Sequence, residues 1–87
     1  MNDSSLLKFP LEFPVKIVGR DTREFHDAVA AILTQHVAPF ASLTVTSQPS
    51  REGRFVSLTV TFTAMSREQL DALYQALTDN EHVLMSL

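Results

Sequence analysis

The clearest hydrophobic pattern in the chain lies between Arg54 and Met65, where apolar and hydroxylated side chains alternate. The apolar set is Val56, Leu58, Val60, Phe62 and Ala64, and the hydroxylated set is Ser57, Thr59, Thr61 and Thr63. A period of two residues is that of a β-strand with one face on a core and the other toward solvent. The many β-branched residues favour the same structure. The pattern therefore predicts a long central strand over 54–65.

Three further stretches alternate over shorter lengths and predict the remaining strands. The first strand is expected over 13–19, the second over 43–47 and the fourth over 81–87. The second has the weakest pattern, which is typical of an edge strand. One face of the fourth strand is expected to hold Val83, Met85 and Leu87. Pro49 and Gly53 predict that the second and third strands are joined by a hairpin loop.

The N-terminal segment 1–12 does not have a helical pattern. It contains Pro10, and a proline inside a helix removes a hydrogen bond and clashes with the preceding turn. We therefore expect 1–12 to form an extended lead-in within a single domain that comprises residues 1–87. Pro14 falls near the start of the first strand, where a missing N–H group is tolerated.

Residues 21–37 have the spacing of an amphipathic helix. The stripe that should face the core consists of Phe25, Val29, Ile32, Leu33 and His36. Asp21 and Glu24 have the spacing of a capping box, and Thr22 is an alternative N-cap. Pro39 ends the helix because proline cannot continue it.

A second helix is predicted from Arg67 to Asp79, where it is closed by Asn80. Ser66 and Gln69 have the spacing of a capping box directly before it. Its apolar stripe consists of Leu70, Leu73, Tyr74 and Leu77. Because charged residues occupy the other positions, one side of this helix should face the core and the other should face water.

The predicted element order is β-α-β-β-α-β. With amphipathic helices and strands that are apolar on one face, this order indicates an α+β domain with a ferredoxin-like fold, in which a four-stranded antiparallel sheet carries both helices on one face. Right-handed crossovers place the first and third strands at the centre and the second and fourth at the edges. The other sheet face stays open. It should display Lys16, Thr44, Thr46, Ser57, Thr59, Thr61, Thr63, His82 and Leu84.

The composition narrows the classes of function. A chain of 87 residues with 45% hydrophobic and 20% charged residues suits one soluble globular domain. Its net charge of −3 disfavours non-specific nucleic-acid binding, which depends on lysine and arginine. The absence of cysteine excludes disulfides and thiolate chemistry. No apolar run approaches the roughly 20 residues that span a bilayer, so we expect a cytoplasmic protein with no membrane partner.

The polar residues do not indicate catalysis or metal binding. His26, His36 and His82 lie on different predicted elements, and no pair has a metal-ligand spacing. Acid–base catalysis needs carboxylates that converge in a pocket, whereas the pairs Glu24 with Asp27 and Glu68 with Asp71 are ordinary neighbours on solvated helix faces. We therefore expect no metal, no cofactor and no enzyme activity.

Nucleic-acid recognition is also disfavoured. RNA-binding domains of this architecture stack bases on aromatic side chains of the central strands. Here Thr59 and Thr61 occupy those positions, and only Phe55, at the start of the strand, could approach that role. We expect no nucleic-acid partner.

Residues spread over the whole chain carry a family resemblance. They are Leu6, Leu7, Phe9, Pro10, Phe13, Lys16, Gly19, Pro49, Ser50, Gly53, Ser57, Ala64, Glu68, Gln69, Leu73, Tyr74, Leu77, Val83, Met85 and Leu87. With this set the chain resembles the YbeD family of small uncharacterised bacterial proteins. The resemblance implies a fold similar to the amino-acid-binding regulatory domains of the ACT type. It also implies a link to lipoate metabolism, because some members are encoded beside lipoate-attachment genes, and it supplies no catalytic residues.

Two hypotheses for function remain, and the favoured one is a non-enzymatic protein-interaction module. In such a module a sheet edge or the open sheet face meets a partner or a second copy. This hypothesis is favoured because it requires no precisely placed groups. Its alternative is a solvated monomer face.

The second hypothesis is a regulatory module that binds a small carboxylate or an amino acid. Gly19 ends a central strand, and Arg20 and Arg23 flank the N-terminus of the following helix, where free N–H groups can bind an anion. An ordinary β-to-α turn, with its arginines paired to nearby carboxylates, explains the same residues and is the commoner structure. Gly19, Arg20 and Arg23 are therefore the candidate ligand site.

Overall fold

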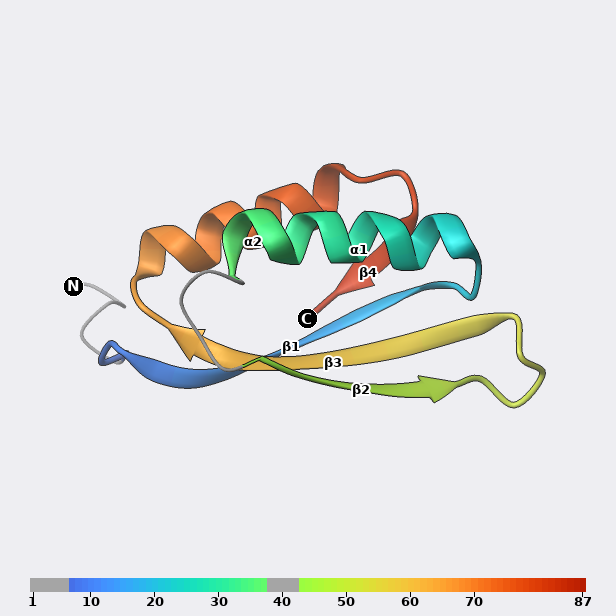
Figure 1. The fold of residues 1–87 in the computed structure, drawn as a ribbon, viewed down its shortest axis with the longest axis horizontal. Helices are drawn as coiled ribbons and strands as arrows, with labels where there is room; N and C mark the ends of the chain where they lie inside the picture. Colours follow the sequence, from blue (N-terminus) through green and yellow to red (C-terminus); the bar gives the residue numbers. More distant parts are fainter. Residues whose placement is uncertain (1–6, 38–42) are drawn as a thin grey trace.

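A computed structural model describes residues 7–37 and 43–87. In chain order the elements are β1 (Leu11–Arg20), α1 (Arg23–His36), β2 (Thr44–Pro49), β3 (Phe55–Ala64), α2 (Arg67–Asp79) and β4 (Val83–Ser86). The strands form one antiparallel sheet of order β2-β3-β1-β4. Both helices lie on the same side of this sheet (Figure 1). The predicted ferredoxin-like architecture, with β1 and β3 at the centre, is confirmed.

The predicted lead-in 1–12 ends two residues earlier in the structure. β1 begins at Leu11, so Leu11 and Glu12 belong to the strand and pair with Ala64 and Thr63 of β3. Residues 1–6 of the lead-in lie outside the described part of the chain.

Alternate residues of β3 face opposite sides of the sheet, as its sequence pattern predicts. Val60 is fully buried and pairs with the fully buried Val15 of β1. The next residue pair, Thr59 with Lys16, lies on the open face, where both side chains reach solvent. Because β2 pairs with β3 in a matching register, Thr46 joins Thr59 on that face.

Pro14 lies in the middle of a central strand without removing a hydrogen bond between β1 and β3. Lys16 exchanges both of its backbone hydrogen bonds with Leu87, at 3.0 and 2.9 Å, on the β4 side. In an antiparallel strand every second residue directs its backbone groups to the same neighbour. Pro14 therefore also faces the β4 side, at a level that Val83–Ser86 does not reach, and its missing N–H group is tolerated there.

The first turn of α1 corrects one prediction. The N-cap is Thr22, whose side-chain oxygen accepts a hydrogen bond from the N–H of Phe25 at 3.1 Å. Asp21, the first capping residue proposed from the sequence, is instead hydrogen-bonded to the ring of His26 at 2.7 Å. Asp21 is paired with His26, so the helix is capped by Thr22, the residue directly before the first helical residue, Arg23.

The capping box before α2 is confirmed and also connects the two helices. The hydroxyl of Ser66 accepts a hydrogen bond from the N–H of Gln69 at 3.0 Å. The side-chain oxygen of Gln69 accepts one from the N–H of Met65 at 2.7 Å, and its amide nitrogen donates to the backbone oxygen of His36 at 3.0 Å. Gln69 thereby satisfies a backbone oxygen in the last turn of α1.

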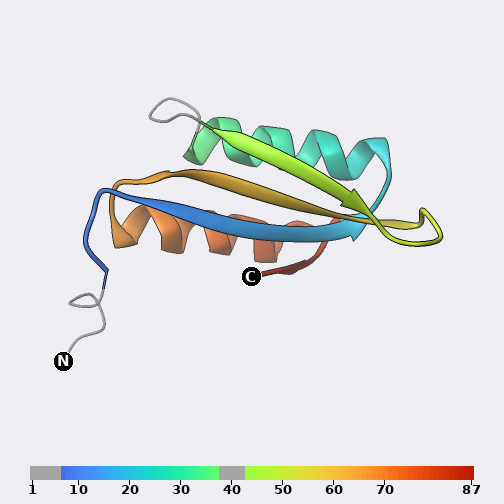
Figure 2. The same ribbon diagram turned by 90° about the horizontal axis from the view of Figure 1, so that it is seen from below.

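The hydrophobic core lies between the sheet and the helices. Its buried members are Val15, Ile17, Phe25, Val29, Ile32, Leu33, Val37, Val56, Leu58, Val60, Phe62, Ala64, Leu70, Leu73 and Leu77. α2 packs over β4, and seen from below the sheet α1 lies on the β2 side (Figure 2). The helix stripes predicted from the sequence thus face the core, except that Tyr74 is only half-buried at the margin and His36 is half-buried and not part of the core.

The prediction that Val83, Met85 and Leu87 share one face of the last strand is wrong. Val83 pairs with Gly19 but Met85 pairs with Val18, so an extra residue, Leu84, is inserted between them as a β-bulge. A bulge places two residues of one strand opposite one residue of its neighbour, and the residues after the bulge change the face to which they point. Val83 therefore packs on the core, whereas Met85 lies on the open face.

Candidate functional site

The candidate site from the sequence begins at Gly19, which is buried at the end of β1. A methyl group on its Cα would overlap the ring of Phe25 and would lie 2.7 Å from the backbone oxygen of His82. Glycine is thus required here because α1 and the chain entering β4 both pack against this point. A ligand contact at Gly19 stays a prediction.

The two arginines of the candidate site contact different residues. The guanidinium carbon of Arg20 lies 5.5 Å from the centroid of the Phe55 ring, the geometry of a cation–π contact. Arg23 pairs with Asp27 at 3.7 Å on the exposed face of α1. At this end of the sheet the structure has a cavity, which is described next. Arg20 lines it, and Arg23 does not.

That cavity has a volume of about 350 Å³ and is lined by Arg20, Thr22, Glu24, Glu81, His82 and Leu84. It lies where β1 ends, α1 begins and the chain enters β4. Two of the lining side chains are carboxylates, one is a guanidinium and one is the imidazole of His82. We call it the Glu24–Glu81 cavity. The carboxylates Glu24 and Glu81 were not assigned a binding role from the sequence, because they are far apart in the chain and only the fold brings them together.

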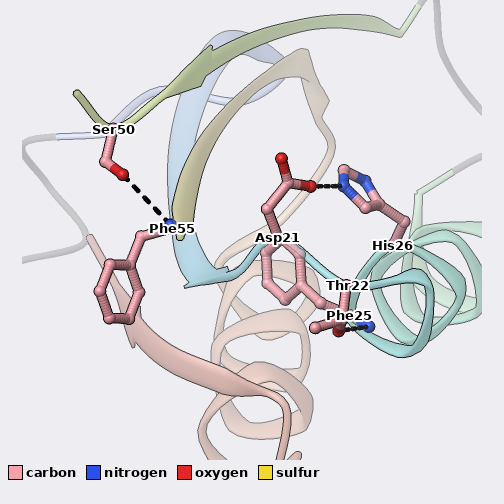
Figure 3. A network of polar contacts seen from close by, with 6 residues as sticks. All are labelled: Asp21, Thr22, Phe25, His26, Ser50 and Phe55. Atoms are coloured by element: carbon pink, nitrogen blue, oxygen red, sulfur yellow. Dashed lines mark hydrogen bonds and ion pairs between the residues drawn. The ribbon is translucent and has the colours of Figure 1, made fainter. Parts of the chain in front are cut away.

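The turn between β1 and α1 uses its polar groups locally. Asp21 and His26 are hydrogen-bonded to each other, and Thr22 caps the helix (Figure 3). The N–H of Asp21 donates to the backbone oxygen of Arg54 at 2.9 Å, which ties the turn to the start of β3. Nearby, the hydroxyl of Ser50 accepts a hydrogen bond from the N–H of Phe55 at 3.2 Å. These contacts hold the rim of the cavity in place.

On the open sheet face, most side chains of β2 and β3 carry hydroxyl groups. One of them, the side-chain oxygen of Ser57, is buried and has no hydrogen-bond partner among residues 7–37 and 43–87. It lies between Val18 and Gln48, its neighbours on the adjacent strands, beside a shallow hollow of about 130 Å³. The flanking side chains cover this hydroxyl closely, so it is not presented to a partner.

The edge of the sheet at β4 differs from the rest of the open face because it is apolar. Leu84, Met85 and Leu87 are 58%, 49% and 65% exposed. Met85 pairs with Val18, and Leu87 is hydrogen-bonded to Lys16, so both belong to the open face. Leu84 lines the Glu24–Glu81 cavity. We call these three residues the β4 apolar edge, and it runs directly into the cavity.

Sequence reasoning missed the β4 apolar edge because strict alternation assigned Met85 and Leu87 to the core. The bulge at Leu84 becomes visible only when β4 is paired with β1. A hint was present in the composition of 83–87, where four of five residues are large and apolar although a half-buried edge strand needs only every second position to be apolar.

The described residues contain neither a metal-ligand group nor a membrane-spanning helix. Over 7–37 and 43–87, no group of three or more histidines and carboxylates is arranged to hold a metal ion. In the same part of the chain, no helix has both the length and the apolar character needed to span a bilayer.

Comparison with known proteins places the chain in a family. Residues 4–87 match the family model described as "Protein of unknown function (DUF493)". The chain belongs to the DUF493 family. A relative from Nitrosomonas europaea, "UPF0250 protein NE1487", is 41% identical over 87 residues, which is 100% of both chains. A UPF0250 protein from Chromobacterium violaceum is 42% identical over 82 residues, 94% of this chain and 92% of the relative. The resemblance to the YbeD family is thereby confirmed.

Solved structures agree on the fold of this DUF493 protein. The ACT domain from GTP pyrophosphokinase of Chlorobium tepidum superposes with a TM-score of 0.72 at 11% identity, over 90% of this chain and 96% of that domain. At this level of identity the likeness shows an ACT-like, ferredoxin-like fold.

Proposed function

We propose that this DUF493 protein is a non-enzymatic protein-interaction module whose contact surface is the β4 apolar edge. The observation that carries the proposal is the exposure of Leu84, Met85 and Leu87 side by side on an edge strand. Single exposed apolar residues are ordinary, whereas a contiguous apolar strip rimmed by polar groups is typical of an interaction site. An unpaired strand edge adds main-chain groups that can extend the sheet.

The opposite edge of the sheet supports the choice of β4. All six residues of β2 are exposed, but threonine, serine and glutamine make up four of them. Pro49 at its end has no N–H group to donate, a common protection of an edge against pairing. β4 has no proline or charged residue over Val83–Ser86.

A second candidate function is supported by the Glu24–Glu81 cavity. Its volume of about 350 Å³ lies within the range of small-molecule sites. It presents one guanidinium and two carboxylates, so an amino acid could place its carboxylate at Arg20 and its ammonium group at Glu24 or Glu81. This is the regulatory hypothesis in which Arg20 and Arg23 were proposed as ligand contacts.

The two candidates are separated by a thermal-shift screen with amino acids and short carboxylic acids. A compound that binds only the folded chain, present at a hundred times its Kd, would stabilise it by about 2.7 kcal/mol. We expect no shift. A reproducible shift that is lost in the Arg20→Gln/Arg23→Gln variant would favour the regulatory function instead.

The interaction function is tested by affinity capture from cells that encode the protein. The bait is used as wild type, as Met85→Ser/Leu87→Ser, and as a matched β2 variant, Leu43→Ser/Val45→Ser. Leu43 directly precedes β2 and Val45 lies in it, and the two are 37% and 47% exposed. We expect proteins captured by the wild type to be retained by the β2 variant and lost by the β4 variant. A lipoate-attachment enzyme among them would support the lipoate link that the family resemblance implies. Identical capture by all three baits would contradict the proposal.

A further inference from the structure

We infer that the β4 apolar edge receives an extended segment of a partner protein, and that this segment carries a basic side chain that enters the Glu24–Glu81 cavity. The inference rests on the proposed function and specifies the chemistry of the partner. It is carried by the continuity of three features along one edge: main-chain groups with no partner among residues 7–37 and 43–87, exposed apolar side chains, and a cavity with two carboxylates at the end where β4 begins.

The main-chain groups follow from the pairing of β4 with β1. Leu87 and Lys16 exchange backbone hydrogen bonds, and Met85 pairs with Val18 two residues earlier. Because alternate residues of an antiparallel strand face the same neighbour, the N–H and C=O groups of Ser86 point away from β1. An added strand can bond to Ser86 and continue the sheet.

The side chains on this edge select for apolar residues in the added strand. Met85 and Leu87 lie two residues apart on the open face, which is the spacing of every second residue in a paired strand. A partner strand with apolar residues at alternate positions would cover both of them. Cross-strand apolar pairs of this kind each contribute roughly 0.2–1 kcal/mol to strand pairing.

The cavity adds a charge preference. Arg20 is the only lysine or arginine in the lining, and its guanidinium is directed over the Phe55 ring. Glu24 forms no ion pair among residues 7–37 and 43–87, and the side chain of Glu81, which is 88% exposed, has His82 at 3.8 Å as its one ion-pair partner in those residues. The two carboxylates therefore leave an excess negative charge that a lysine or arginine side chain would complement.

A second copy of this chain fits the edge less well. Each copy carries a net charge of −3, so the two would repel each other. Self-pairing also brings no basic side chain into either cavity. A partner segment with a basic residue satisfies all three features.

The experiment is a titration of ¹⁵N-labelled protein with synthetic peptides, followed by amide chemical shifts. The probes are peptides of about nine residues in which valine and threonine alternate, a length typical of a strand. One pair carries an arginine near the N-terminus or near the C-terminus, because the direction of the added strand is open. A matched pair carries norleucine in place of arginine. Free arginine serves as a small-molecule probe.

We expect one arginine peptide to shift the amides of Leu84 and Ser86 and to bind about two- to fivefold more tightly than its norleucine counterpart, the upper part of the range for one exposed ion pair. In the Glu24→Gln/Glu81→Gln variant this advantage should disappear. The advantage should also shrink as salt is raised from roughly 10 to 300 mM. Both substitutions replace exposed side chains, and an unchanged melting temperature checks that the variant is folded.

Three results would overturn the inference, and they differ in what they mean for the proposed function. Equal binding of arginine and norleucine peptides at β4 would show that the partner needs no basic side chain, but it would leave the interaction function intact. Shifts by free arginine at the cavity that equal those by the peptide, with Ser86 unmoved, would favour the small-molecule function. No β4 shift with any peptide at millimolar concentration would reject strand addition, while the capture experiment still decides whether β4 is a contact surface.

Discussion

The two faces of the sheet have opposite characters although the same strands build them. On the helix-covered side, Val15, Val60 and their neighbours are almost fully buried. On the open side, β2 and β3 present mainly hydroxyl groups, and Met85 and Leu87 are exposed at the β4 edge. The first face stabilises the domain, because its side chains form the hydrophobic core. The second face is free to carry a contact surface, because substitutions there leave the core intact.

The largest expected effect compares adjacent residues of β3. Val60→Asp places an unpaired carboxylate in the core, which costs several kcal/mol, a large part of the stability of a small domain. Thr61→Asp places it on the open face, where the cost should stay near about 0.5 kcal/mol. Thermal unfolding followed by circular dichroism should show an unfolded or severely destabilised first variant and a folded second one. Similar melting temperatures would mean that the two faces do not differ in burial.

The next effect concerns the two glycines. Gly19→Ala should destabilise the fold by about 1–3 kcal/mol, because the added methyl group overlaps the Phe25 ring and crowds the backbone of His82. Gly53 has a φ of 78° and open space around it, so Gly53→Asn should be nearly neutral, since asparagine tolerates this conformation. Denaturant midpoints of the two variants compare a packing glycine with a turn glycine. A Gly19→Ala variant as stable as wild type would show that close packing does not require glycine at this position.

A smaller effect is expected from Tyr74 at the margin of the core. Burial raises the pKa of its phenol above the ordinary value of 10.0. The folded state therefore binds the phenol proton more tightly than the unfolded state does. The contribution of this proton to the free energy of unfolding is complete below pH 10 and is lost as pH rises through the folded pKa. Because the chain has one tyrosine and no tryptophan, an ultraviolet titration reports this phenol alone. Its midpoint should be higher in the folded than in the urea-unfolded chain, and Tyr74→Phe should lose less stability above pH 10 than wild type.

The smallest expected change in stability is that of Met85→Ser/Leu87→Ser. Both side chains are about half exposed or more, so the melting temperature should move little, by roughly the amount that surface substitutions produce. The same variant should fail in the capture experiment. A strong loss of stability would instead place these residues in the core, as strict alternation predicts, and would remove the β4 apolar edge.

Most of the fold followed from local patterns, whereas the site did not. Alternation in 54–65 and the capping box at Ser66 depend on neighbours in the sequence, so the sequence alone was enough to predict both. The N-cap was less certain, because Asp21 and Thr22 can both serve and only the pairing of Asp21 with His26 decides between them.

The contact surface depends on long-range pairing and could not be read in the same way. The bulge at Leu84 results from the fit of β4 to β1, and it turns Met85 from the core to the open face. The Glu24–Glu81 cavity joins residues that are distant in the chain. Of the candidate residues Gly19, Arg20 and Arg23, the structure brings Arg20 alone into that cavity, and the ligand role of all three stays a prediction.

Site-specific photo-crosslinking in living cells tests the central claim most directly, namely that β4 is the contact surface. A photoreactive amino acid replaces Met85 on β4 or, as the matched control, Thr46 on the open face of β2. We predict discrete adducts larger than the chain from position 85, which disappear when Leu87→Ser is added, and few or none from position 46. Adducts of equal yield from both positions, or from position 46 alone, would contradict the account.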